Sequence, residues 1–233
     1  MKKLIIADWK KYLFEFISIF VAVFAAFALD SWKEGRKDHV IETKILTEIY
    51  NGLEKDLEDI EVNEKGHQQG IEAIQYFKDL ITNKPIRQDS LSIYFTNLLR
   101  DFVSIQNTSG YETLKSKGLE TIENDSLRSQ IISLYEYDYS TLRKLEEEYS
   151  ELQFHESYFQ EFNKAIAPNI KFDSNASQVG LNSPIKISEN ERNILIVNLW
   201  KIKTNRVFIL YFYSDVKRKI NKLQDEIQKE LKS

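Results

Sequence analysis

The longest apolar run of the chain lies near its N-terminus, over residues 12–29, where 18 positions include one charge, Glu15. At about 1.5 Å per residue, a helix of this run covers roughly 27 Å, and Trp32 extends it toward a ~30 Å hydrocarbon core. Apolar residues surround the helix on all sides, which is typical of a membrane span and not of a buried soluble helix. The pattern predicts one transmembrane helix over residues 12–32, after a basic tail of residues 1–11.

A cleaved signal peptide is the main alternative to a retained span. Four lysines in the first 11 residues form a basic start, and residues 26–28 (Ala-Phe-Ala) match the small-residue cleavage pattern. Two features favour a retained helix: Glu15 lies inside the apolar run, and no polar residues separate that run from the possible cleavage site at residues 26–28. Trp9, Tyr12 and Trp32 bracket the run, and such rings prefer the membrane interface.

Basic residues on the two sides of the span indicate its orientation. The four lysines before it equal in number the basic residues within about twenty positions after it, but they lie closer together and add the free amine. Cytoplasmic flanks are enriched in Lys and Arg. We therefore expect a single-pass protein whose N-terminus is cytoplasmic and whose C-terminal domain, residues 33–233, lies on the other side of the membrane.

Glu15 has two interpretations. An ionisable residue within a span can mark a proton relay or a contact with a partner. One turn from the edge of the span, however, the carboxylate can reach the headgroups at small energetic cost. The position of Glu15 favours this second, structural interpretation.

The pattern changes to a one-sided helical stripe over residues 40–81, which predicts a long amphipathic helix. Its middle, residues 62–70, is polar and contains Gly66 and Gly70, each of which costs about 1 kcal/mol inside a helix. This stretch predicts a break, a kink or a weak turn, so the element is either one continuous rod or folds back. The first part of the stripe is Ile41, Ile45, Ile49, Leu53, Leu57 and Ile60.

Shorter elements follow. Apolar spacing predicts a helix over residues 90–104 and another over 111–117, which Gly118 ends as a left-handed C-cap. Asn124 or Asp125 then caps a helix that continues to about residue 166.

The C-terminal part of the chain begins with a loop. Residues 168–187 are rich in Asn and Ser, and a loop of this length is mobile or a contact site. The last helix opens with the capping-box spacing of Ser188 and Glu191 and runs to about Leu231. Its apolar segment 207–213 is too short to cross a bilayer and is predicted to pack in the core. Residues 216–231 have spacing that suits a coiled coil.

Outside residues 177–187 no alternating run exceeds four positions, so no strand pattern competes. The predicted fold class is therefore all-α: one N-terminal transmembrane helix, then an extramembrane bundle of long antiparallel helices with a coiled-coil-like C-terminal helix.

The amino-acid composition excludes several classes of functional site. The chain has no Cys, which excludes disulfides, zinc–thiolate sites, iron–sulfur clusters and Cys nucleophiles. A net charge of -4 argues against a general nucleic-acid binder. The 42% hydrophobic and 29% charged residues suit a folded chain.

Candidate catalytic groups are sparse. His39, His67 and His155 are far apart in sequence and are predicted to be solvated helix-surface residues. The acidic run 146–148 is predicted to be a solvated face, and the tyrosines of 135–139 are predicted to be half-buried with their hydroxyls in water. No Gly-rich phosphate loop or nucleophile elbow occurs in the sequence. We therefore predict no catalytic residue, metal, cofactor, nucleic acid or small-molecule substrate.

Two stretches carry a resemblance. The first is the span with its juxtamembrane motif, and the second is a Ser-x-Gly block followed by Leu-Arg. Together they resemble a family of bacterial single-span, membrane-anchored helical proteins of unknown function. The matching residues are Glu15, Ala22, Leu29, Asp30, Trp32, Glu34, Arg36 and Lys37, then Ser116, Gly118, Leu127 and Arg128.

The resemblance implies an inner-membrane anchor and a helical extramembrane domain in the periplasm, and it implies no activity. Ala22 stands where the family commonly has Gly, and Lys117 replaces the second Ser of its block.

Three functions fit these observations. The first is a non-enzymatic, membrane-anchored helical scaffold that contacts lipid and protein partners, as a homo-oligomer or as an accessory subunit of a larger membrane complex. The alternative is a sensor or signalling module whose helical domain senses a ligand or partner. The third is an enzyme or transport accessory that uses Glu15 as an intramembrane carboxylate.

Overall fold

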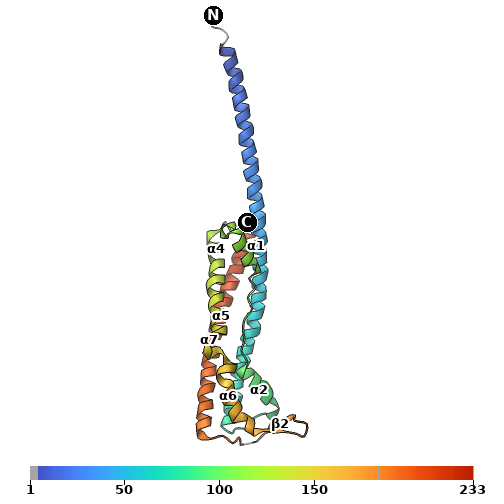
Figure 1. The fold of residues 1–233 in the computed structure, drawn as a ribbon, viewed down its shortest axis with the longest axis vertical. Helices are drawn as coiled ribbons and strands as arrows, with labels where there is room; N and C mark the ends of the chain where they lie inside the picture. Colours follow the sequence, from blue (N-terminus) through green and yellow to red (C-terminus); the bar gives the residue numbers. More distant parts are fainter. Residues whose placement is uncertain (1–4, 183, 233) are drawn as a thin grey trace.

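The computed structural model describes residues 5–182 and 184–232, and the chain is all-α apart from one short hairpin (Figure 1). The all-α prediction is therefore confirmed. Residues 1–4 of the predicted basic tail lie outside the described residues. One hydrophobic core joins the helices of the bundle.

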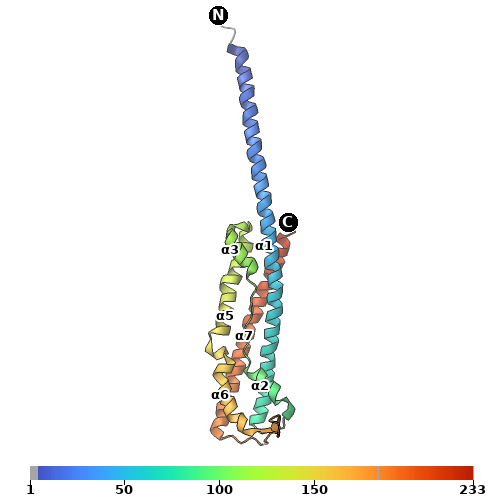
Figure 2. The same cartoon turned by 45° about the vertical axis from the view of Figure 1, so that its right-hand side comes forward.

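The first helix, α1 (Ile5–Ile81), is a single helix of 77 residues. Its first half projects beyond the bundle and its second half runs down through it (Figures 1 and 2). Side chains of residues 11–40 are exposed, and core contacts begin at Ile41 and Ile45. The helix continues through residues 62–70, so the break or turn predicted there is wrong. Of the two arrangements considered, the continuous rod is the one found.

The last helix, α7 (Glu189–Glu230), runs antiparallel to α1 and ends beside the point where α1 leaves the bundle (Figures 1 and 2). Ser188 and Glu191 form the predicted capping box, with both side-chain bonds present. The C-terminal apolar positions Ile220, Leu223 and Ile227 are buried in the core of the same chain.

Helix α2 (Leu91–Leu99) follows a 3-10 turn, η1 (Gln88–Ser90), and is shorter than predicted. It ends because Arg100 adopts an extended backbone, with φ -71° and ψ 129°. Residues 100–108, which we call the strap, then lead in a non-helical conformation to α3 (Ser109–Lys117).

Gly118 ends α3 with φ +104°, as the C-cap prediction requires, and its N–H donates to the carbonyl of Leu114 at 3.0 Å. L-residues rarely adopt such a φ. Gly118→Ala should therefore lower the free energy of unfolding by about 1 kcal/mol or more, measured by urea titration of the detergent-solubilised chain. The exposed neighbour Ser116→Ala is the control and should change it little. An unchanged stability for Gly118→Ala would show that the cap is unimportant.

The helix predicted from residue 124 to 166 is interrupted. After a 3-10 turn, η2 (Leu119–Thr121), Asn124 caps α4 (Asp125–Ile132) by accepting from the N–H groups of Ser126 and Leu127. A π-helical turn, η3 (Ser133–Asp138), leads into α5 (Tyr139–Glu147).

The interruption falls at residues 148–153, around the 3-10 turn η4 (Ser150–Leu152), before α6 (Phe154–Ile166). Asp101 of the strap accepts hydrogen bonds from the N–H groups of Phe154 and His155. A distant carboxylate thus caps a new helix N-terminus, which the local sequence pattern does not show.

The predicted irregular loop contains a small hairpin. The 3-10 turn η5 (Ala167–Asn169) precedes β1 (Ile170–Phe172), which pairs antiparallel with β2 (Gln178–Leu181) at the end of the bundle far from the α1 projection (Figure 1). The Gln88 side chain accepts from the N–H of Leu181 at 3.1 Å, which ties the hairpin to the turn before α2.

Candidate functional site

The apolar part of α1 is long and apolar enough to cross a membrane. Glu15 and Ala22 are seven residues apart and therefore share one face of the helix. The Arg36 guanidinium lies over the Trp32 ring, 5.7 Å from its centroid, at the end of the apolar run. The remaining motif residues of this segment are also exposed: Leu29, Asp30, Glu34 and Lys37.

The second motif stretch has a structural role. Arg128 donates to the carbonyl of Ile122 at 2.8 Å and pairs with Asp125, which fixes the turn before α4. Leu127 is buried in the core, and the Ser116 hydroxyl bonds back to its own helix. These contacts stabilise the loop that Gly118 begins.

The second motif stretch contacts α1 near the base of the α1 projection, just after the first motif stretch ends. Asp38 and Ile41 of α1 line a groove of about 320 Å³ with residues 117–123. The buried carboxylate of Glu42 accepts from the backbone N–H of Glu123 at 3.0 Å. This loop therefore holds α1 at the point where it enters the bundle.

Three carboxylates bind the strap to the bundle. Asp59 accepts from the N–H of Ile105 at 2.8 Å, and Asp56 accepts from the N–H of Asn107 at 2.6 Å. Glu146 accepts from both the N–H and the hydroxyl of Ser104. Backbone N–H groups without helix or sheet partners need such acceptors when they are buried.

Glu146 is only 3% exposed, so the solvated face predicted for residues 146–148 is wrong at this position. The carboxylate of Glu146 on α5 is buried because the strap packs against it through Ser104. The neighbours Glu147 and Glu148 are exposed, as predicted.

Two tyrosine hydroxyls donate further hydrogen bonds to the buried carboxylates of Asp56 and Glu146. Tyr139 donates to Asp56 at 2.6 Å, and Tyr213 donates to Glu146. Tyr135 and Tyr139 are buried and Tyr137 is 68% exposed, so the prediction of half-buried tyrosines fails for all three. Burial raises the pKa of Asp56 to about 6 and also raises the pKa of Glu146.

The raised pKa of Asp56 gives a pH prediction. The folded chain binds this proton more tightly than the unfolded chain, in which the pKa is near 4, so Asp56 contributes more stability as pH falls from 7 toward 4. Asp56→Asn removes the titration. The unfolding free energy of the wild type minus that of the variant should therefore rise between pH 7 and pH 5 in urea titrations. A constant or falling difference would contradict the assignment.

Arg206 occupies the centre of the bundle and is fully buried. Its Nη2 donates to the carbonyls of Asn97, Leu98 and Arg100, where α2 ends, and its guanidinium lies 3.9 Å from the centroid of the Phe154 ring. A cation is favourable at a helix C-terminus and over an aromatic face. Burial lowers the pKa of Arg206 to about 9, so the guanidinium remains charged at neutral pH.

His67 lies against this guanidinium, so its predicted surface position is wrong: it is 2% exposed. Burial and Arg206 lower the pKa of His67 to about 3, which leaves the imidazole neutral. Its Nδ1 then accepts from Nη1 of Arg206 at 2.9 Å. The ring of Phe102 packs on it, with 5.0 Å between centroids.

Helix α1 approaches its neighbours closely at its glycines. A Cβ on Gly66 would lie less than 3.0 Å from the Phe102 ring, and one on Gly70 less than 3.0 Å from the Arg206 guanidinium. On α3, a Cβ on Gly110 would likewise lie less than 3.0 Å from the backbone nitrogen of Ile49 on α1. The glycines that weaken the helix in isolation are therefore the positions where the strap and α7 reach it.

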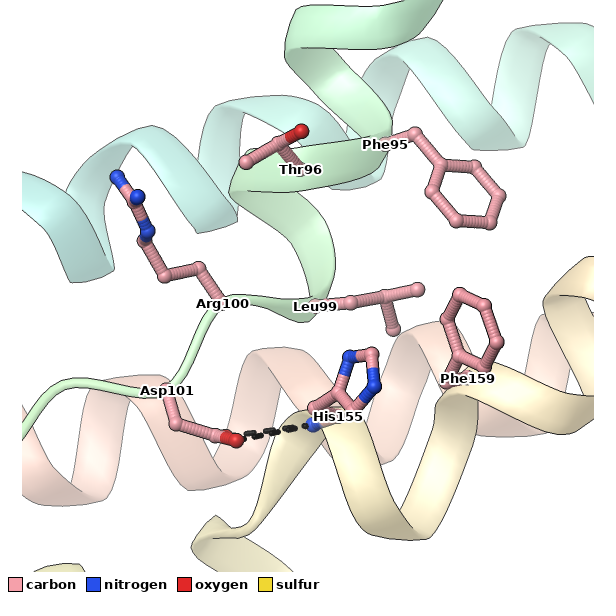
Figure 3. A pocket seen from close by; sticks show the side chains of 7 residues that line it. All are labelled: Phe95, Thr96, Leu99, Arg100, Asp101, His155 and Phe159. Carbon is pink, nitrogen blue, oxygen red and sulfur yellow. Dashed lines mark hydrogen bonds between the residues drawn. The ribbon is translucent and has the colours of Figure 1, made fainter.

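A groove of about 540 Å³ opens between α2 and α6 (Figure 3). Phe95, Leu99 and Phe159 form its apolar side, with the His155 ring stacked on Phe159. Asp101 lies at the other end, where its carboxylate already accepts from backbone N–H groups of α6. The carboxylate of Asp101 in this groove therefore serves to cap the N-terminus of α6.

Helix α7 also carries apolar side chains on the side away from the core. Trp200 is 65% exposed and Tyr211 is 74% exposed. Of residues 207–213, which were predicted to pack in the core, Ile209 and Tyr213 are buried and Leu210 and Phe212 pack partly against the core. The prediction is wrong for the exposed Val207, Phe208 and Tyr211. We call this set the α7 outer face: Ile196, Val197, Trp200, Val207, Phe208 and Tyr211.

The α7 outer face lies on the half of α7 far from the α1 projection, where the helix forms the edge of the bundle (Figure 1). At 100° per residue, Trp200, Val207 and Tyr211 point opposite the buried Ile202 and Ile209. The face is therefore directed away from the rest of the chain.

The sequence contained a signal for several of these positions. Buried positions on α7 are spaced alternately by four and three residues through Ile202, Arg206 and Ile209. This spacing, which is visible in the sequence, assigns the cationic Arg206 to the buried side of the helix. Asp56 and His67 occupy equivalent core positions on α1. Asp101 had no such signal, because its role depends on contacts distant in sequence.

Comparison with known proteins matches no family model, no curated protein and no solved structure. Among the described residues, no cluster of three or more His, Cys, Asp or Glu side chains is placed to hold a metal ion.

Proposed function

We propose that this chain is a non-enzymatic, membrane-anchored helical interaction protein of a bacterial inner membrane. It acts as a homo-oligomer or as an accessory subunit of a larger membrane complex. In this proposal it belongs to the single-span family that its motifs resemble, with a cytoplasmic N-terminus and a periplasmic bundle. The exposed apolar part of α1 supports the anchor.

The observation that carries the proposal is the α7 outer face. Single exposed apolar residues are common, but a contiguous apolar patch on a folded domain marks an interaction site. Trp200 and Tyr211 are residue types enriched in the centres of interfaces. In this proposal the face binds a protein partner of the anchored bundle.

The hydrogen bonds of four acidic side chains in the bundle support a non-enzymatic role. Asp56, Asp59 and Glu146 accept hydrogen bonds from the strap, and Asp101 caps α6. Each of these carboxylates binds backbone N–H groups of the chain itself. Burial raises the pKa values of Asp56, Asp101 and Glu146, and these shifts accompany a structural use of the acids, as also occurs outside active sites.

The test is the size and composition of the assembly extracted from membranes in a mild detergent. The wild type should elute as a defined species larger than one chain. Trp200→Glu combined with Tyr211→Glu should dissociate it, because two carboxylates cannot be buried unpaired at an interface. Tyr137→Glu, which alters an equally exposed aromatic side chain on η3, is the matched control and should leave the assembly intact.

Thermal melting of all three proteins shows whether the bundle remains folded. An unchanged assembly in the folded double variant would remove the α7 outer face from the proposal. A wild-type chain that is monomeric, with no protein bound after crosslinking, would contradict the proposal as a whole.

The continuity of α1 favours the sensor as a second candidate. One helix passes from the apolar segment into the bundle core without a break, so a movement of either part displaces the other. A small molecule that raises the melting temperature of the full chain in a saturable way would support a sensor. A broad metabolite screen without any shift would count against it.

A further inference from the structure

We propose that the α7 outer face packs against the same face of a second copy of this chain, with the two α7 helices parallel. The inference rests on the proposed anchoring and deepens it by naming the partner. The outer face is the surface of α7 opposite Ile202 and Ile209, so this contact leaves the packing of the bundle unchanged.

Anchoring fixes the relative direction of the two helices. If α1 of each copy enters the same membrane from the same side, a two-fold axis relating the copies must be perpendicular to the membrane. Each α7 runs antiparallel to its own α1, so the two α7 helices then run in the same direction. Identical residues consequently meet near the axis.

The spacing of the outer face suits a parallel pair. Its central line consists of positions that alternate by three and four residues, as do the a and d positions of a coiled coil. From the first to the last of them the helix rises about 21 Å, which is two heptads. The line is Val197, Trp200, Thr204, Val207 and Tyr211.

The charges flanking this line are compatible with a second copy. In a parallel pair, a residue at position g faces position e of the next heptad on the other helix. Lys203 of one copy then meets Phe208 of the other, and Ile196 meets Lys201. A lysine beside an aromatic ring or under an apolar side chain is favourable, and these layers contain no pair of like charges.

The size of the face is adequate for a pair. Its six side chains are each 40% to 74% exposed, which gives on the order of 500 Å² of apolar surface when the aromatic residues are taken at about 150–250 Å². The lysine stems and Ile194 at its edge add to this. The total approaches the roughly 800 Å² per partner of a standard interface.

Disulfide trapping in membranes tests the pairing, and the chain has no cysteine that would interfere. Val197→Cys and Val207→Cys, each alone, should give a homodimer on mild oxidation. Glu72→Cys is the control: it is an exposed position on α1, two residues from Gly70, which faces Arg206 of α7, and so lies at a similar distance from the membrane. It should remain monomeric under the same conditions.

A second variant excludes random collision as the cause. Trp200→Glu in the Val207→Cys background should reduce the disulfide-linked dimer at least tenfold, and melting of the reduced protein shows that it is folded. Absence of a homodimer from both valine positions would overturn the pairing. If those cysteines instead link to a different protein, the pairing fails and the proposed interaction function stands, whereas a monomer with no crosslink contradicts both.

Discussion

Arg206→Met should lower the free energy of unfolding by about 3 kcal/mol. The methionine fills much of the arginine volume but leaves the carbonyls of Asn97, Leu98 and Arg100 without the guanidinium that now binds them. Each buried acceptor left unsatisfied costs about 1–3 kcal/mol, and relief of the buried charge offsets part of the sum. Urea titration of the full chain in detergent, monitored by circular dichroism, measures the loss.

Two variants show whether this loss comes from the hydrogen bonds. Arg218→Met removes an exposed arginine of the same helix and should change stability by less than about 0.5 kcal/mol. Arg206→Lys retains the charge, but an ammonium lacks the planar fork that reaches several acceptors at once, so it should recover only part of the loss. An Arg206→Met variant as stable as the wild type would contradict the central role of this residue.

Gly70→Ala should destabilise the bundle by about 2 kcal/mol, although alanine is the better helix former by about 1 kcal/mol. The new methyl group would lie less than 3.0 Å from the buried Arg206 guanidinium, which cannot move without losing its carbonyl partners. Overpacking of a filled core costs about 1–3 kcal/mol or more. Gly66→Ala should act in the same direction against the Phe102 ring.

Gly35→Ala provides the control within the same helix. Apart from the local helix backbone, no atom lies within 4 Å of the position that its Cβ would take, so only helix propensity remains and stability should be unchanged or slightly higher. Thermal melts of the three variants in one detergent compare them directly. A stabilised Gly70→Ala chain would show that α7 does not approach α1 as closely as the structure indicates.

The sequence predicted the long helices well because their signals are local. The apolar run, the stripe of residues 40–81 and the capping box of Ser188 and Glu191 each depend on neighbours within a few turns. Gly118 was also identified correctly as a helix boundary, and of the two caps predicted for the next helix, Asn124 or Asp125, the structure has Asn124, since one backbone angle or one side chain decides each.

The errors occur where distant contacts override local preference. Gly66 and Gly70 predicted a break because helix propensity describes a residue in an isolated helix, without tertiary contacts. In the structure, Phe102 and Arg206 pack against the helix at these two glycines and stabilise it there. The interruption before α6 depends on Asp101, far away in sequence.

His67 and Glu146 were predicted on the surface because ionisable side chains usually lie there. In the structure, His67 binds a buried guanidinium and Glu146 binds the strap. The same contacts explain why these polar residues support the fold, whereas the side chains of the α7 outer face remain 40% to 74% exposed.

The number of copies in the native assembly tests the account most directly. Native mass spectrometry of the full chain, transferred from its membrane into lipid nanodiscs without crosslinking, measures that number together with any bound protein. We predict a defined assembly that contains at least two copies of the 27.5 kDa chain. A single chain with no bound protein would contradict the interaction function.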